Sequence, residues 1–173
     1  GSGIVVNGQM VYGHDGFAGE LGHTCAVRYN GRQCNCGKVG CLETYASAIG
    51  VARTAREWLD MSDEPSTLRS LEVITSKDVY DAAIAGDSIA KKVFEFTGQK
   101  LGESFADFVA FSTPEAIILF GGLAEAGDLI MKPIVEAMEA NLLSIWKGGK
   151  VKVLRSGLKD SDAAILGAGA LAW

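Results

Sequence analysis

Residues 19–43 of the chain, GELGHTCAVRYNGRQCNCGKVGCLE, hold all four cysteines and one of the two histidines among the 173 residues. Cys34, Cys36 and Cys41 fall within eight residues, and His23 lies eleven residues before the first of them. Three thiolates and one neutral imidazole make a closed, tetrahedral ligand set of the kind found in structural zinc sites. Glycines at positions 31, 37 and 40 allow so short a loop to fold back on itself. The stretch therefore predicts a zinc site formed by these four side chains.

A disulfide framework and an incidental cluster are the two other interpretations of these cysteines. A bond between Cys34 and Cys36 is disfavoured, because only one residue separates them and their side chains tend to diverge. The chain also shows no cleavable apolar leader, so an oxidising compartment is not implied. Cys25 has no place in the metal pattern, and we expect it to be a buried free thiol.

Two motifs in this stretch, Glu20-Leu21-Gly22-His23 and Cys34-x-Cys36-Gly37-x-x-Gly40-Cys41-Leu42-Glu43, resemble the paired signature of the ROK family. That family groups bacterial sugar kinases with sugar-responsive transcriptional repressors. The glycine-rich run Gly1–Gly16 and the later motifs are also similar to the family, so the resemblance covers essentially the whole chain. It is closest to the glucokinase-type members.

Length and composition fit one domain spanning residues 1–173. A chain of this length can bury a sizeable core, and 48% of its residues are hydrophobic. No apolar run reaches the length needed to span a bilayer. The net charge is −5 and no basic cluster is present, so we expect no binding of nucleic acid or of a membrane surface by this chain. A cytoplasmic location is the default expectation.

The N-terminal segment has the pattern of a β-hairpin. Two short apolar runs flank Asn7-Gly8, which favours a type I′ turn. His14 and Asp15 follow among glycines; they could be ligands, but polar residues in such a setting more often form turns. We expect a third strand over residues 24–28, with Glu20 and His23 on the loop that enters it.

Helices are expected in the middle of the chain. Residues 42–60 carry apolar residues at helical spacing, with Glu43 in the first turn. The apolar residues are Leu42, Tyr45, Ile49, Ala52, Ala55 and Leu59. Residues 61–75 read as a connector, and a short capped helix starts near Ser76. Asp87 is expected to cap a longer helix that ends near Phe111. Its apolar stripe predicts core packing and not a binding platform; the stripe consists of Ile89, Val93, Phe96, Leu101, Phe105 and Phe108.

The last third of the chain has an alternating pattern. The apolar run Ala116–Phe120 ends in Gly121-Gly122, which is typical of a strand buried on both faces. A helix over 128–145, a strand over 151–155 and a helix from Asp162 to the end are expected after it. This order predicts an α/β fold with a parallel or mixed sheet and flanking helices. The family resemblance implies, more narrowly, the C-terminal lobe of an actin-like, ribonuclease-H-like ATPase fold.

The metal loop also carries the candidate substrate-binding residues. A histidine with one ring nitrogen on a metal presents the other as an N–H donor in a fixed direction. His23 could thus donate to a substrate hydroxyl, and Glu20 and Glu43 could accept from hydroxyls. In the alternative interpretation His23 is only a ligand, Glu20 is solvated, and Glu43 complements a helix N-terminus for ~0.3–1 kcal/mol. The resemblance implies sugar contacts for all three residues. Four protein ligands leave zinc no open position, so its role would be structural.

Gly121-Gly122 is a candidate nucleotide-binding element. Two glycines at the carboxyl end of a strand would let the backbone approach a ligand closely, although such a pair is most often a turn. The resemblance implies that these glycines line the adenosine pocket. Gly167 and Gly169 could share that pocket, with close helix packing as the simpler explanation.

The resemblance implies that this chain is the C-terminal lobe of an ATP-dependent hexose kinase, with glucose as the expected sugar and Mg-ATP as the phosphoryl donor. The family's kinases carry a phosphate loop and a catalytic aspartate in an N-terminal lobe, and nothing in residues 1–173 matches either element. We therefore expect no catalytic base in this chain and no activity of the chain alone. The resemblance also implies a homo-oligomeric whole protein. One alternative is the effector-binding domain of a ROK-type repressor. Another is a zinc-stabilised interaction module with no sugar role.

Overall fold

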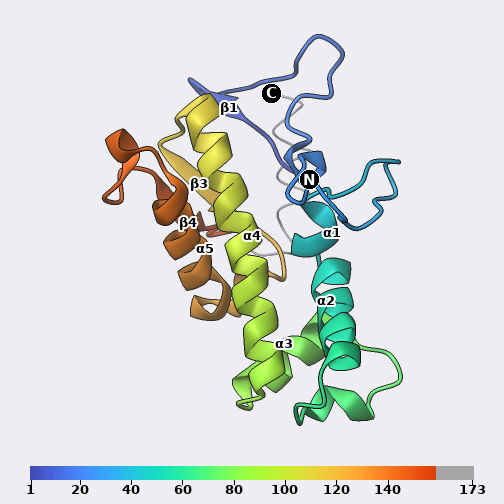
Figure 1. Ribbon diagram of the computed structural model, residues 1–173. Coiled ribbons are helices and arrows are strands. Elements are labelled where there is room, and N and C mark those ends of the chain that lie inside the picture. Colours follow the sequence, from blue (N-terminus) through green and yellow to red (C-terminus); the bar gives the residue numbers. More distant parts are fainter. Residues whose placement is uncertain (159–173) are drawn as a thin grey trace.

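The computed structural model describes residues 1–158, so the expected helix from Asp162, with Gly167 and Gly169, lies outside the described residues. The long helix α4 (Ser88–Ser112) runs through the middle of the molecule. Helix α5 (Asp128–Asn141) packs along one side of it, and α2 (Ala48–Met61) and α3 (Ser76–Ile84) pack along the other (Figure 1). None of the helices in this part of the chain is long and apolar enough to cross a membrane.

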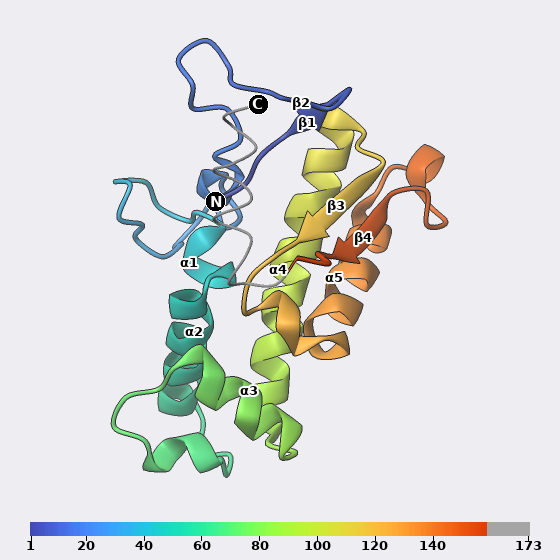
Figure 2. The same cartoon turned by 180° about the vertical axis from the view of Figure 1, so that it is seen from behind.

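The predicted hairpin is confirmed at the start of the chain. Strand β1 (Val5–Val6) pairs antiparallel with β2 (Gln9–Met10). Asn7 and Gly8 have φ values of 52° and 77°, and a type I′ turn requires positive φ at both central residues. Figure 2 shows this hairpin near the C-terminal end of α4.

The expected strand over residues 24–28 is wrong. Within this segment only Cys25 forms a bridge, antiparallel to Cys41. The backbone N–H groups of Ala26 and Val27 both donate to the Gly40 carbonyl, at 2.8 and 3.1 Å. The segment is therefore held as a loop against the cysteine-rich turn instead of running on as a strand.

The helix expected over residues 42–60 is two helices, α1 (Glu43–Ala46) and α2. Ser47 between them has an extended backbone (φ −96°, ψ 169°), and its hydroxyl accepts from the Gly50 N–H at 3.1 Å as the cap of α2. The restart turns Ile49 outward, to 81% exposure, although the apolar pattern placed it in the core. Ala55 and Leu59 are buried as expected.

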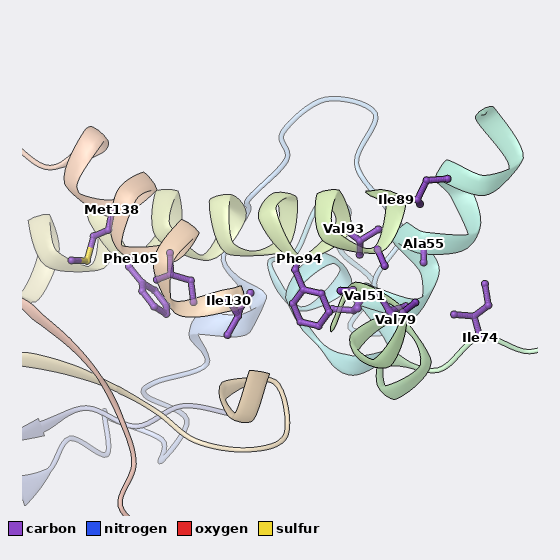
Figure 3. Packing of buried hydrophobic residues seen from close by; sticks show 14 of the residues in the cluster. Val51, Ala55, Ile74, Val79, Ile89, Val93, Phe94, Phe105, Ile130 and Met138 are labelled. Carbon is purple, nitrogen blue, oxygen red and sulfur yellow. The ribbon is translucent and has the colours of Figure 1, made fainter. Parts of the chain in front are cut away.

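The helices α3 and α4 begin where the sequence predicts. Thr75 caps α3 through a capping box with Asp78, after the connector that includes the 3₁₀ turn η2 (Thr67–Ser70). Asp87 caps α4 by accepting from the Ala90 N–H at 3.1 Å. Figure 3 shows that the hydrophobic core follows α4: it includes Phe105, Ile130 and Met138 where α4 meets α5, and Val51, Val79, Val93 and Phe94 toward α2 and α3.

The strand β3 (Ala116–Leu119) pairs in parallel with β4 (Lys152–Arg155), with Ile118 opposite Leu154. The expectation that this strand is buried on both faces is wrong. Ile117 and Leu119 pack against the core, whereas Ile118 is 65% exposed and Leu154 is 44% exposed. The core formed with α4 and α5 lies against one face of this two-stranded sheet, among the described residues (Figure 2).

The connection between the two strands contains the 3₁₀ turns η3 (Ala124–Ala126) and η4 (Ser144–Trp146). Helix α5 ends at Asn141 and not near Ile145, because Leu142 has an extended backbone (φ −64°, ψ 146°). Residues 144–146 then form a separate turn. A strand, a helix and a second strand parallel to the first (β3, α5 and β4) follow one another, which is the order expected for an α/β unit.

Candidate metal centre and its loop

The four predicted ligands come together at one point. One ligand atom each from His23, Cys34, Cys36 and Cys41 can be chosen so that all lie within 4.8 Å of one another. The Cys36 and Cys41 Sγ atoms are 3.6 Å apart, and His23 Nδ1 is 3.7 Å from Cys34 Sγ. Tetrahedral zinc with Zn–S bonds of about 2.3 Å would hold its sulfurs about 3.8 Å apart. All four cysteines lie in the described part of the chain and are free thiols, so the disulfide interpretation does not apply.

Glycines let the loop close around this point. At Gly40, where φ is 81°, an added Cβ would lie 1.8 Å from the Val27 carbonyl oxygen. At Gly31 it would lie 2.7 Å from the Gly40 Cα, so the two sides of the loop pack backbone to backbone. Between them, Cys34 N–H donates to the Lys38 carbonyl at 2.9 Å and forms the turn that presents the thiols.

The thiols of this loop differ in acidity. A hydrogen bond from the Lys38 backbone is the main cause that lowers the pKa of Cys36 to about 7. Burial is the main cause that raises the pKa of Cys41 to about 12, and the neighbouring thiols add to it. Metal binding needs both groups as thiolates, so binding would displace protons from this site.

Cys25 is exposed, so the expectation of a buried thiol is wrong. It belongs to the segment that remains a surface loop instead of forming a strand. Within residues 1–158, its strand-like contact is the bridge to Cys41.

Glu20 and Glu43 each lie beside one member of the cysteine and histidine cluster. Glu20 precedes the 3₁₀ turn η1 (Leu21–His23), and its Oε2 atom lies 3.9 Å from His23 Nε2. Glu43 opens α1, and its Oε1 atom lies 3.7 Å from Cys34 Sγ. His23 therefore presents Nδ1 to the cysteines and Nε2 to Glu20. The Glu20 side chain is 62% exposed and that of His23 is 31% exposed, so this side of the cluster is open to a ligand.

The start of the chain is tied to the same loop. The Ser2 hydroxyl donates to the Gly19 carbonyl and accepts from the Leu21 N–H at 3.2 Å. These bonds hold the backbone on both sides of Glu20. Asp15, in contrast, accepts from the Phe17 N–H at 3.3 Å, which is the turn role expected for it.

Gly121-Gly122 follows β3 at the carboxyl end of the parallel pair. Gly121 has a φ of 99°, which favours glycine, and an added Cβ would meet nothing within 4 Å at either position. The pair thus borders open space at the edge of the sheet where α/β folds place ligands.

Sequence reasoning missed Arg32, which is only 8% exposed. It sits between a loop glycine and the first cysteine of the cluster, where no periodic pattern predicts burial. A charged residue in a loop is usually solvated. The partners of its side chain lie twelve or more residues away, so only the folded chain shows them.

The chain belongs to the ROK family, because residues 1–173 match the profile of that family over their whole length. It is 39% identical over 173 residues to a glucokinase of Halalkalibacterium halodurans, a match that covers 98% of this chain and 52% of the relative. It is 32% identical over 163 residues to the DNA-binding transcriptional dual regulator NagC of Escherichia coli, covering 94% of this chain and 39% of that protein.

Solved structures give the same two groups. A ROK family glucokinase from Streptomyces griseus in complex with glucose and AMPPNP superposes with a TM-score of 0.85 at 30% identity, over 98% of this chain and 55% of that one. A ROK family transcriptional regulator, a homologue of the E. coli Mlc protein, superposes with a TM-score of 0.79 at 30% identity, over 91% and 39%. The fold is therefore that of the ROK sugar kinases, the actin-like ATPase fold, as predicted. The chain spans about half the length of its glucokinase relatives.

Proposed function

We propose that residues 1–173 form the C-terminal lobe of an ATP-dependent hexose kinase whose substrate is glucose. The observation that carries this proposal is the placement of Glu20, His23 and Glu43 around one cluster of metal-ligating side chains. The similarity to a glucokinase at 39% identity supports it. An enzyme of this class works where ATP is made and used, so we propose a cytoplasmic location.

The metal of the proposed site is zinc, held by His23, Cys34, Cys36 and Cys41 in the loop 19–43. The donor set and the sulfur spacing fit this ion. Zinc with four protein ligands would act as an anchor that fixes the loop. Metal analysis of the purified protein should find about one equivalent of zinc, as a single closed site requires. A folded protein without metal would contradict this assignment.

The sugar would be held by the groups that border the cluster, namely the His23 ring and the carboxylates of Glu20 and Glu43. With Nδ1 as the metal ligand, His23 would carry its ring proton on Nε2 and would donate from there. The carboxylates of Glu20 and Glu43 are acceptors, so a pair of neighbouring hydroxyls would find a donor and two acceptors. A hydrogen bond to a charged group contributes ~1.5–3 kcal/mol.

The chemical step belongs to the whole protein. We assign this chain no base, because the aspartate expected to deprotonate the 6-hydroxyl has no match in residues 1–173. The 6-oxygen would attack the γ-phosphorus of Mg-ATP in line, its proton would pass to that aspartate, and the bond from the γ-phosphorus to the bridging oxygen would break to release ADP. Gly121-Gly122 is proposed to border the adenosine, since its backbone faces open space at the end of β3.

Glu20→Gln in the whole kinase tests the sugar assignment. The glucose KM should rise roughly ten- to a hundredfold, because a neutral amide replaces a charged acceptor, while the KM for ATP stays within twofold. Glu95→Gln, an exposed glutamate on α4, is the control and should change neither value. An unchanged glucose KM in Glu20→Gln would remove Glu20 from the site.

A second candidate function is the effector domain of a sugar-responsive repressor, favoured by the 32% identity to NagC over 94% of this chain. Such a protein would bind sugar at the same loop without turning over ATP. Glucose-dependent ADP release by the whole protein supports the kinase; sugar binding without turnover supports the repressor. Absence of any sugar binding in calorimetry would favour the interaction module.

A further inference from the structure

The guanidinium of Arg32 is buried, and both of its terminal nitrogens donate hydrogen bonds. Removing a charge from water costs several kcal/mol, a cost that well-placed hydrogen bonds offset. Here Nη1 donates to the Thr44 carbonyl at 2.7 Å and to the Gly50 carbonyl at 3.3 Å. Nη2 donates to Thr54 Oγ1 at 2.8 Å and to Glu57 Oε2 at 2.6 Å. One side chain thus joins the metal loop to both α1 and α2.

The backbone of Arg32 adds two more links. Its N–H donates to the Tyr45 hydroxyl at 2.8 Å, and its carbonyl accepts from the Gly40 N–H at 2.9 Å. The guanidinium carbon also lies 4.6 Å from the centroid of the Tyr45 ring, within the range of a cation–π contact. Arg32 is therefore in contact with the residues that follow Glu43 and with the turn that precedes Cys41.

Helix α1 needs such support. It has four residues, too few to be stable by itself, and Ser47 separates it from α2. Glu43 is its first residue, and Thr44 and Tyr45 are the two that Arg32 holds. The direction of the Glu43 carboxylate thus depends on where Arg32 fixes this single turn.

We propose that Arg32 is a positioning residue of the sugar site, which sets the place of Glu43 relative to the metal cluster. The inference rests on the proposed function, because it assumes that Glu43 contacts the sugar. Lysine cannot replace the arginine, since one ammonium group cannot reach acceptors on two sides as a planar guanidinium does. A purely structural role would change stability and leave glucose affinity intact.

Arg32→Lys in the whole protein tests this. We expect the glucose Kd measured by calorimetry to rise roughly tenfold, as for one lost hydrogen bond to a charged group. The zinc content should remain at the wild-type level, and the KM for ATP should stay within twofold of the wild-type value. Arg53→Lys is the matched control, because Arg53 Nε donates to the other oxygen of Glu57 at 2.7 Å and its side chain is 47% exposed. The control should leave the glucose Kd unchanged.

A double-mutant cycle shows whether Arg32 acts through Glu43. In a Glu43→Gln background, Arg32→Lys should change the glucose Kd by less than twofold, since the group that Arg32 positions has already lost its charge. Glu57→Gln, which keeps an acceptor beside Arg32, serves if Arg32→Lys does not fold, and should raise the glucose Kd two- to threefold by the weaker anchoring of the guanidinium.

The outcomes separate the two proposals. A wild-type protein that binds no glucose overturns the proposed function and this inference with it. Normal glucose binding by both the wild type and Arg32→Lys overturns this inference alone. Loss of zinc from Arg32→Lys, or additive effects of the two substitutions in the cycle, would assign Arg32 to the stability of the loop instead.

Discussion

Two buried threonines differ in whether their hydroxyl groups are paired. Thr54 on α2 donates to the Gly50 carbonyl at 2.8 Å and accepts from Arg32. Thr97 on α4 is equally buried, and its hydroxyl has no partner among the described residues. A buried polar group without a partner costs ~1–3 kcal/mol. Thr97→Val should therefore raise the free energy of unfolding by about 1 kcal/mol, measured by urea denaturation.

Thr54→Val is the matched control for that measurement. It deletes a hydroxyl that is used and leaves a guanidinium N–H unpaired, so it should lower the free energy of unfolding by ~1–3 kcal/mol. Shifts of the same sign in the two variants would contradict the difference in pairing.

At the residue scale, the grouping of His23 with three cysteines could be predicted because short spacing and ligand chemistry depend on the local sequence alone. The same reasoning failed for Arg32 and Cys25. The burial of Arg32 depends on carbonyls and side chains of α1 and α2. These groups are distant from Arg32 in the sequence, so the local sequence does not predict the contacts. Cys25 is exposed because its segment pairs with the cysteine turn instead of entering a sheet.

The contact between α4 and α5 depends on two glycines in α4. A Cβ at Gly102 would lie 2.4 Å from the Ile134 carbonyl oxygen, and one at Gly98 would lie 2.6 Å from Pro133 Cγ. Alanine is a better helix former than glycine by about 1 kcal/mol, but a clash with backbone outweighs that gain. Gly102→Ala should lower the free energy of unfolding by about 1–3 kcal/mol.

Urea denaturation checks this prediction, with Gln99→Ala on the exposed side of the same helix as the control. The control should stay within about 0.5 kcal/mol of the wild type. A Gly102→Ala protein as stable as the wild type would mean that the two helices are further apart than the structure places them.

The N-terminus of α4 gives a pH-dependent prediction. Burial by itself raises the pKa of Asp87, but hydrogen bonds from the Ala90 N–H, the Ser66 hydroxyl and the Thr67 N–H outweigh it and hold the pKa below the usual value. The folded state thus binds a proton less readily than the unfolded state. The stabilisation is complete above the unfolded pKa of about 3.9 and is lost as the pH falls through the lower folded pKa.

Asp87→Asn should therefore lower the free energy of unfolding by about 1 kcal/mol at pH 7, because an amide N–H₂ cannot accept from the Ser66 and Thr67 hydroxyls. The difference from the wild type should narrow at pH 3. Urea denaturation at both pH values measures this, with the exposed Asp107→Asn as the control. A deficit that stays constant with pH would show that the carboxylate charge has no part in the cap.

At the element scale, long helices with charged caps could be predicted, as α4 with Asp87 shows. The break at Ser47 could not, because the apolar spacing of residues 42–60 continues through it while the serine hydroxyl favours a new helix start. The single covered face of β3 was also missed. A continuous apolar run is compatible with burial on both faces of the strand. Which face is exposed depends on the elements that pack against the sheet, and the run itself does not specify them.

In the proposed function, residues 1–173 would supply binding groups, and the rest of the protein would complete the catalytic set. Phosphoryl transfer needs a phosphate-binding element and a base held together with the sugar. Residues 1–173 contain no match to either element. The 173-residue chain by itself should therefore give no ADP release above background in a coupled assay with glucose and Mg-ATP. Turnover at ordinary kinase rates would show that the catalytic groups lie within this chain.

An exposed apolar face should make the same 173-residue chain associate. Ile118 and Leu154 lie side by side across β3 and β4 and are exposed, and Phe120 follows on the same strand face. Apolar groups gathered on one face of an open sheet are a site of association.

Light scattering should give a mass above that of the 18.2 kDa monomer. Ile118→Lys should shift the measured mass toward that of the monomer, because it places a charge in the contact. Ile49→Lys, which changes an even more exposed isoleucine on α2, is the control and should leave the mass unchanged. A monomeric wild-type chain would show that this face is covered within the chain itself.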